Sequence, residues 1–176
     1  YLARFDEMQA TGVSLAGPPP TKTSARPDRR LPPPRRNLPG TETVAAQART
    51  YFTPARERIL ADLLPQLKQA KTVDVGMYLL TDAELRATLA EIASNAEVRV
   101  VVDAGVLAGK GIGNLQVLWD AGVKIAVFRG DRAAMHLKSV VIDERYVWTG
   151  SANWTETALG GNYEDMLCFD SPALAQ

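Results

Sequence analysis

A short stretch near the end of the chain concentrates residue types that suit phosphodiester chemistry. It has the pattern H-x-K-x4-D-x6-G-S-x-N, with fixed positions at His136, Lys138, Asp143, Gly150, Ser151 and Asn153. An imidazole can attack phosphorus and form a covalent intermediate. A lysine ammonium and an asparagine amide can donate to the phosphate oxygens on which charge develops. Glycine allows close backbone approach to a phosphate, and nothing in this chemistry requires a metal.

The elements that must position these groups are predicted to form a β-hairpin. Residues 135–142 alternate and are rich in β-branched side chains, which predicts a strand on which His136 and Lys138 share one face. The polar residues 143–145 fit a turn, and residues 146–149 return as a second strand. A hairpin centred near Glu144 places Gly150 opposite Lys138. Ser151 and Asn153 then reach the end of the sheet that carries the imidazole.

The pattern resembles the HKD signature of the phospholipase D superfamily, over residues 49–175 and most specifically over residues 135–169. That family includes phospholipases D, cardiolipin and phosphatidylserine synthases, and metal-independent endonucleases. The resemblance implies an α/β fold, an α-β-α sandwich built on a mixed sheet. It also implies that His136 is the nucleophile that becomes phosphohistidine.

The resemblance assigns roles to the other motif residues. Lys138 and Asn153 match the phosphate-binding pair, Ser151 matches the hydroxyl of the G-S element, and Asp143 matches an aspartate that bonds neighbouring chain. Residues 162–165 look like the family's N-x-E-N segment, with Asp165 in place of the usual Asn. Glu164 there matches the carboxylate that accepts the imidazole N–H and orients the ring; its alternative is a solvated loop acid.

The chain has a single histidine, whereas two-step transfer through histidine also needs a general acid for the leaving oxygen. In the resembled family two HKD motifs face each other and each supplies one histidine. The site is therefore expected to need a second half. That half is either another copy of this chain in a homodimer or the N-terminal half of a two-motif protein. The start of the chain, residues 1–8, resembles the short helix that follows an HKD repeat in two-motif members, which favours the second alternative.

Composition limits the other possibilities. The formal net charge is zero, so no global field favours nucleic acid or a membrane. No apolar run approaches the length of a transmembrane span. The single cysteine, Cys168, excludes an internal disulfide and reads as core. One histidine and one cysteine make no plausible zinc site, and no cofactor is expected. The compartment stays open, with a periplasmic or secreted location slightly preferred over a cytoplasmic one.

The chain is expected to divide into three parts: a short helix at residues 1–10, a Pro/Arg-rich linker at residues 11–48 and an HKD domain at residues 49–176. Residues 18–40 hold eight of the eleven prolines and six basic residues against one aspartate. This composition is typical of an extended tether. Its functional alternative is a basic arm that holds a phosphate backbone or anionic lipid.

Within the domain, hydrophobic periodicity predicts strands alternating with helices, which gives the mixed sheet. The expected strands cover residues 49–53, 72–79, 98–102, 123–128 and 166–169, besides the hairpin. The expected helices cover residues 54–70, with Pro65 as a possible kink, then 82–94 with Asp82 as N-cap, 111–121, and a helix or turn at 154–158.

Further residues are candidates for substrate contact. Trp154 follows Asn153 and could line the groove, stacking a base or meeting a lipid tail, whereas Trp148 reads as core. Arg129 and Arg132 precede the motif as possible rim cations or as plain solvated charges. Residues 105–113 are expected to form a glycine-rich rim loop carrying Lys110, because the dinucleotide fingerprint spacing is absent.

The sequence therefore favours a metal-independent phosphodiesterase, foremost a nuclease. A phospholipase D or phosphatidyltransferase acting on phospholipid head groups is the alternative, because the phosphodiester is common to both substrates. A non-catalytic lobe that binds phosphate or nucleic acid is a second alternative.

Overall fold

The computed structural model describes residues 13–14, 43–107, 111–129 and 133–176. Their eight strands form one sheet in the order β1-β5-β4-β3-β6-β7-β8-β2. The strands are β1 (Val13–Ser14), β2 (Gln47–Phe52), β3 (Thr72–Met77), β4 (Glu97–Asp103), β5 (Lys124–Phe128), β6 (Lys138–Ile142), β7 (Tyr146–Gly150) and β8 (Asp165–Asp170). The helices are α2 (Arg56–Gln69), α3 (Ala83–Ile92), the 3-10 turn η1 (Ala104–Leu107), α4 (Gly111–Asp120), α5 (Glu156–Gly160) and α6 (Pro172–Ala175).

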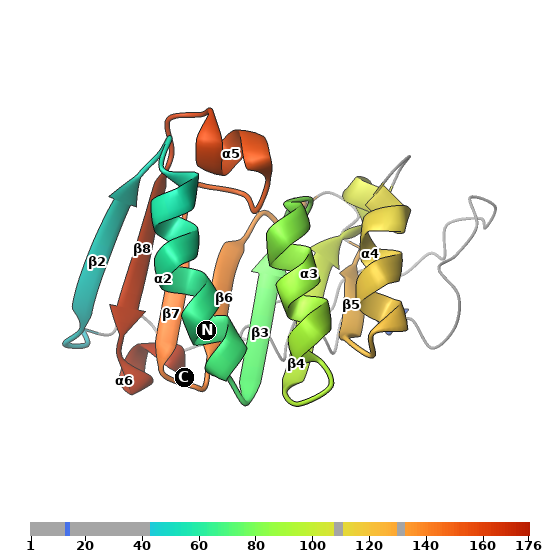
Figure 1. Ribbon diagram of the computed structural model, residues 1–176, viewed down its shortest axis with the longest axis horizontal. Coiled ribbons are helices and arrows are strands. Elements are labelled where there is room, and N and C mark those ends of the chain that lie inside the picture. Colours follow the sequence, from blue (N-terminus) through green and yellow to red (C-terminus); the bar gives the residue numbers. More distant parts are fainter. Residues whose placement is uncertain (1–12, 15–42, 108–110, 130–132) are drawn as a thin grey trace.

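The sheet is mixed, as the sequence predicts. Strands β3, β4 and β5 run parallel and are joined by the crossover helices α3 and α4, whereas β6, β7, β8 and β2 run antiparallel to their neighbours. Helices α2, α3 and α4 lie side by side over one face (Figure 1). Helix α6 packs its Ala175 against Val141 and Val147 on the other face. The α/β fold with a sheet flanked by helices is confirmed.

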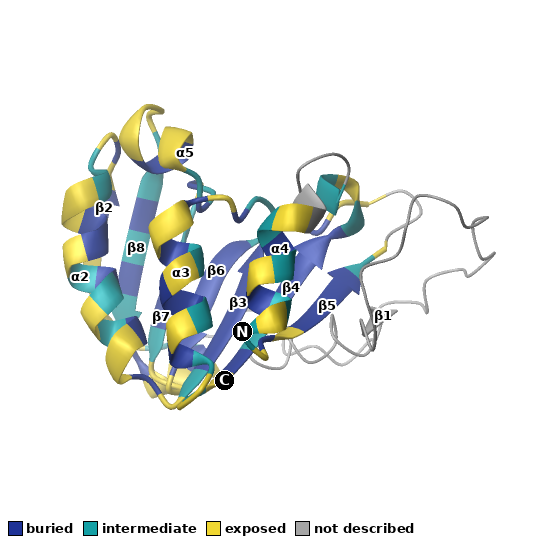
Figure 2. Cartoon of the chain, turned by 45° about the vertical axis from the view of Figure 1, so that its right-hand side comes forward, coloured by how far each residue is buried: buried dark blue, intermediate teal, exposed yellow. Residues whose placement is uncertain are grey.

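The core lies between the sheet and the three long helices. The inner face of α2 is Ile59, Leu60, Leu63 and Leu67, all buried, at the spacing that a helix needs to present one apolar stripe. Figure 2 shows the buried positions concentrated on the strands and on the sides of the helices that face them. Pro65 lies inside α2 without splitting it. Trp148 and Cys168 are buried, as predicted, and burial raises the pKa of the Cys168 thiol to about 11.

Two expectations from the sequence differ from the structure. The first motif strand begins at Lys138 rather than at residue 135, so Met135, His136 and Leu137 precede it without regular structure. The predicted linker contributes a short strand, because Val13–Ser14 pairs with β5. The predicted helix at residues 1–10 and most of the linker lie outside the described residues.

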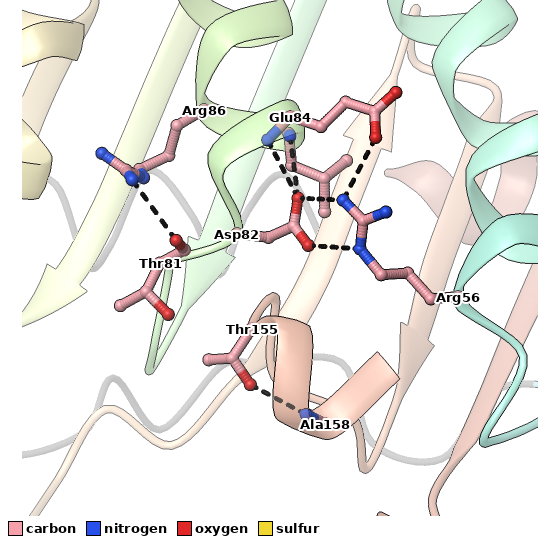
Figure 3. Close-up of polar contacts among 8 residues, drawn as sticks. Arg56, Thr81, Asp82, Glu84, Arg86, Thr155 and Ala158 are labelled. Carbon is pink, nitrogen blue, oxygen red and sulfur yellow. Dashed lines mark hydrogen bonds and ion pairs between the residues drawn. The ribbon is translucent and has the colours of Figure 1, made fainter. Parts of the chain in front are cut away.

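The loop at Asp82 connects the helical layer to the chain that follows the motif. Asp82 caps α3 as predicted, accepting from the backbone N–H groups of Glu84 and Leu85, and it receives Arg56 of α2 through two nitrogens at 2.8 and 3.0 Å (Figure 3). The N–H groups of Thr81 and Asp82 both donate to the carbonyl of Trp154 at 2.9 Å. This loop therefore fixes the backbone directly after Asn153.

The Asp82 network gives a stability prediction. Burial alone would raise the pKa of Asp82, but the Arg56 guanidinium and the two capping N–H groups outweigh it and hold the pKa below its usual value. Asp82→Ala should lower the free energy of unfolding by about 2–4 kcal/mol, through loss of a cap and of a mostly buried ion pair. Urea unfolding measures this loss.

The pH dependence and a control test the explanation. Because the folded pKa is lowered, the contribution is complete above the unfolded pKa and is lost as the pH falls through the folded value. The difference between wild type and Asp82→Ala should therefore shrink in acid. Glu84→Ala, which removes an exposed partner of the same Arg56, should change stability by no more than about 0.5 kcal/mol. An equal loss in both variants would contradict the role of Asp82.

Candidate active site

The strand register brings the motif residues other than Asp143 to one end of the sheet, as the hairpin predicts. Ser139 pairs with Thr149 and Ile142 with Tyr146, so the hairpin is centred on Glu144 and Lys138 lies across from Gly150. Asp143 and Glu144 both adopt positive φ, near 52°, which matches the right-handed twist of a tight hairpin. The end of the sheet at which Lys138 lies also holds the carboxyl ends of β3, β7 and β2 and the start of β8.

The imidazole of His136 lies directly beside the Lys138 ammonium. The Lys138 Nζ atom is 3.0 Å from Nδ1 and 3.1 Å from Nε2 of the ring, and it donates to the His136 carbonyl at 2.9 Å. His136 is exposed, whereas Lys138 is 9% exposed. An accessible imidazole is thus adjacent to an ammonium group that the first residue of β6 holds in place. That pairing suits attack on an anionic phosphodiester.

Burial and a carboxylate act in opposite directions on Lys138. Burial lowers the pKa of its ammonium, and the negative charge of Glu164 opposes this shift. Glu164 is therefore close enough to interact electrostatically with Lys138, although Lys138 begins β6 and Glu164 directly precedes β8. Lys138 thus contacts the His136 imidazole and interacts electrostatically with Glu164.

Glu164 has a different hydrogen-bond partner from the one that the family resemblance implies. Its carboxylate accepts from the Ser151 hydroxyl at 2.6 Å and from the Asn162 amide at 3.1 Å. The Ser151 hydroxyl oxygen in turn accepts the Asp165 N–H at 3.0 Å. In the described residues no hydrogen bond joins Glu164 to His136, whose ring nitrogens contact Lys138 instead. Glu164 is therefore neither a freely solvated acid nor the imidazole's partner in this arrangement.

Asn153 and Asp143 use their oxygens to hold neighbouring chain. The Asn153 side-chain oxygen accepts the Leu79 N–H at 3.2 Å, at the end of β3. This contact fixes which side of the amide is the NH₂ group, a donor. At the opposite end of the hairpin, one Asp143 oxygen accepts the N–H groups of Lys71 and Thr72 at 2.7 and 2.9 Å. Asp143 thus anchors the hairpin to the start of β3.

Two substrate-contact predictions require correction. Trp154 is 1% exposed and belongs to the main core, so its ring has no face to offer a base or a lipid tail. Gly150 is required by the sheet. A Cβ there would lie 2.2 Å from the Asp165 carbonyl oxygen of β8, so the close approach that the sequence assigned to a phosphate is to a neighbouring strand. Arg129 is exposed. Arg132 and Lys110 lie outside the described residues. Of the predicted rim loop, residues 105–107 belong to the 3-10 turn η1 and residues 111–113 to helix α4, so its described residues are helical.

Two residues of the site are missed by the sequence pattern. Tyr78 lies against the His136 ring at 4.7 Å between centroids, and its N–H donates to the Leu137 carbonyl at 2.8 Å. Asp103 accepts the Met135 N–H at 2.7 Å. Both residues end or follow a strand of the parallel half, far in sequence from the motif. Their only signal in the sequence is a polar or aromatic residue at the end of an apolar run.

Comparison with known proteins agrees with this geometry. Residues 63–176, well over half of the chain, match the family model described as "Cardiolipin synthase, PLD-like domain". The chain belongs to the phospholipase D superfamily. Members of this superfamily are generally phosphodiesterases.

Individual relatives support the same assignment. The chain is 32% identical over 116 residues to the mitochondrial cardiolipin hydrolase of Homo sapiens, which covers 65% of this chain and 45% of that protein. The Danio rerio protein of the same name is 30% identical over 118 residues, covering 65% and 51%. The chain thus spans about half the length of these curated relatives.

Solved structures share the fold. NucT from Helicobacter pylori superimposes with a TM-score of 0.68 at 22% identity, covering 74% of this chain and 89% of that one. Nuc from Salmonella typhimurium, a phospholipase D family member, gives a TM-score of 0.66 at 22% identity and covers 74% and 88%. Within the described ranges, no helix has the length and apolar character to cross a bilayer. In the same ranges, no cluster of three or more His, Cys, Asp or Glu side chains is arranged to hold a metal ion.

The interaction between Glu164 and Lys138 yields a pKa prediction. Because the Glu164 charge raises the pKa of Lys138 against the effect of burial, Glu164→Gln should lower that pKa further. Titration of the lysine side-chain signals by NMR measures the change. Glu97→Gln is the matched control, since Glu97 contacts the exposed Lys124 at 2.6 Å and should leave Lys138 unaffected. A Lys138 pKa that is the same in wild type and Glu164→Gln would contradict the predicted coupling.

Proposed function

We propose that this domain cleaves phosphodiesters without a metal, through a covalent phosphohistidine at His136, and that its substrate is nucleic acid. The observation that carries the chemistry is the exposed imidazole held against the buried Lys138 ammonium. The Nε2 or Nδ1 lone pair attacks phosphorus, and the bond to the leaving oxygen breaks. That oxygen takes a proton from a second histidine. Water then gives a proton to that second histidine and attacks the phosphohistidine, which breaks the N–P bond, restores the imidazole and releases the phosphorylated product.

Each motif side chain has a part in this proposal. A phosphate oxygen is a charged acceptor and competes with the imidazole for the Lys138 ammonium, which frees a ring nitrogen for attack. The Asn153 NH₂ group, whose orientation the Leu79 contact fixes, donates to the same phosphate. Glu164 orients the imidazole once the Ser151 hydroxyl turns from the carboxylate to the substrate. Gly150 and Asp143 serve by holding the hairpin.

The choice of nucleic acid rests on charge and surface character. Residues 18–40 carry six basic side chains against one acid, which suits a phosphate backbone. The large apolar side chains that are exposed in the described residues are Phe52, Val117 and Tyr163, which come from separate segments. The segments of Phe52 and Tyr163 adjoin, since Thr53 bonds Asn162 and Glu164, but no single loop of the described residues carries two of these side chains. The relatives named cardiolipin hydrolase favour a phospholipid substrate as the second candidate.

Cleavage of labelled single-stranded DNA in excess chelator tests the chemistry. Wild type with its second HKD half in place should cleave, and His136→Ala should lose about 10⁴-fold or more because the nucleophile is absent. Lys138→Ala should lose roughly 10²-fold or more, whereas Lys124→Ala, at an exposed lysine elsewhere on the sheet, should keep wild-type activity. Full activity of His136→Ala would overturn the phosphohistidine. Hydrolysis of cardiolipin vesicles but not of DNA would replace the nuclease by the second candidate.

We further propose that the general acid comes from a second HKD half, because this chain supplies one histidine. If that half is another copy, the active species should sediment as a dimer. Its specific activity should then fall on dilution. If the half is a different chain segment, this chain alone should be inactive and regain activity when that segment is added. A fully active monomer would contradict both forms of the proposal.

A further inference from the structure

The nucleophile lies on a segment that no strand pairing holds. Residues 133–137 have no regular secondary structure, and β6 begins only at Lys138. His136 is exposed, so core packing of its own side chain does not position it either. Its placement therefore depends on how the residues on either side of it are fixed.

Asp103 fixes the N-terminal side of this segment. It is the last residue of β4 and is 7% exposed. One carboxylate oxygen accepts the Gly105 N–H at 2.7 Å, which is an ordinary local turn contact. The other accepts the Met135 N–H at 2.7 Å, across 32 residues of sequence. Met135 is itself buried against Val101 and Ala126, so the contact is shielded from water.

Tyr78 fixes the other side of the segment. Its N–H donates to the Leu137 carbonyl, and its ring lies against the imidazole. The backbone on both sides of His136 is thus hydrogen-bonded to the ends of two parallel strands, β3 and β4. Of these two contacts, the one from Asp103 involves a charged acceptor and is the stronger type.

We propose that Asp103 is a positioning residue for the nucleophile, an inference that rests on the proposed function of His136. Its carboxylate holds Met135 in the conformation from which the imidazole reaches the phosphorus. A displacement of about 1 Å at a reacting group is enough to cost about 100-fold in rate. Asp103 lies outside the motif and touches no reacting atom, so its effect passes entirely through the backbone of the segment.

The substitution Asp103→Asn separates the two contacts of this carboxylate. An asparagine keeps one acceptor oxygen, which can still serve the local turn at Gly105. Its NH₂ group then faces the Met135 N–H, so donor meets donor and the long-range bond is lost. The variant should lower kcat by about 10- to 100-fold and leave KM within about twofold, because substrate binding by Lys138 and Asn153 is unchanged.

The single histidine provides a readout that a purely structural role would not move. His136 gives the only imidazole resonances of the chain, and Asp103→Asn should shift and broaden them. Asp74→Asn is the matched control. Asp74 is a buried carboxylate on the adjacent strand β3 that is paired with Arg99. Its loss should reduce stability while the His136 resonances stay as in wild type.

The outcomes separate this inference from the proposed function. Unchanged kcat and unchanged imidazole signals in Asp103→Asn, with His136→Ala inactive, would overturn the positioning role alone. An active His136→Ala would overturn the proposed function itself. If Asp103→Asn does not fold, hydrogen exchange of the Met135 amide in wild type tests the positioning role instead. The inference requires protection of this N–H despite the lack of regular structure, and exchange at the rate of a free amide would overturn it.

Discussion

The register of three antiparallel strands is the constraint on which the site depends. With the hairpin centred on Glu144, β6 and β7 pair so that Lys138 and Gly150 lie at the same end of the sheet. Strand β8 pairs with β7 so that Glu164 lies beside Ser151. A slip of one residue would turn every side chain to the opposite face of the sheet. The electrostatic contact between Lys138 and Glu164 would then be lost, although every motif residue would still be present.

Two features of the hairpin protect that register. Asp143 binds the N–H groups of Lys71 and Thr72 at the turn end, so the hairpin is fastened to the start of β3. At the other end, Gly150 lets β8 approach to a distance that a side chain would forbid. Two positions of a catalytic signature thus serve the geometry of the sheet. Their value to the chemistry is that they hold Lys138 and Ser151 in place.

The arrangement of charges describes a site that is ready for an anion. The Lys138 ammonium is partly desolvated, contacts the imidazole and is balanced by the charge of Glu164. Glu164 is hydrogen-bonded to Ser151 rather than to His136. An incoming phosphate offers Lys138 a charged acceptor in place of the imidazole, so under the proposed function substrate binding itself releases the imidazole from Lys138. A bound phosphodiester would thus replace the contact between Lys138 and the imidazole.

The sequence by itself determined the elements and the motif. The apolar stripe of α2, the Asp82 cap, the hairpin centred on Glu144 and the mixed sheet all follow from local periodicity and turn chemistry, which nearby residues encode. The tertiary structure decided what surrounds the motif. It buried Trp154, started β6 only after His136 and paired Glu164 with Ser151. It also brought Tyr78 to the His136 ring and Asp103 to the backbone of Met135. These contacts join residues that are far apart in the chain, and no local pattern records which strand ends will meet.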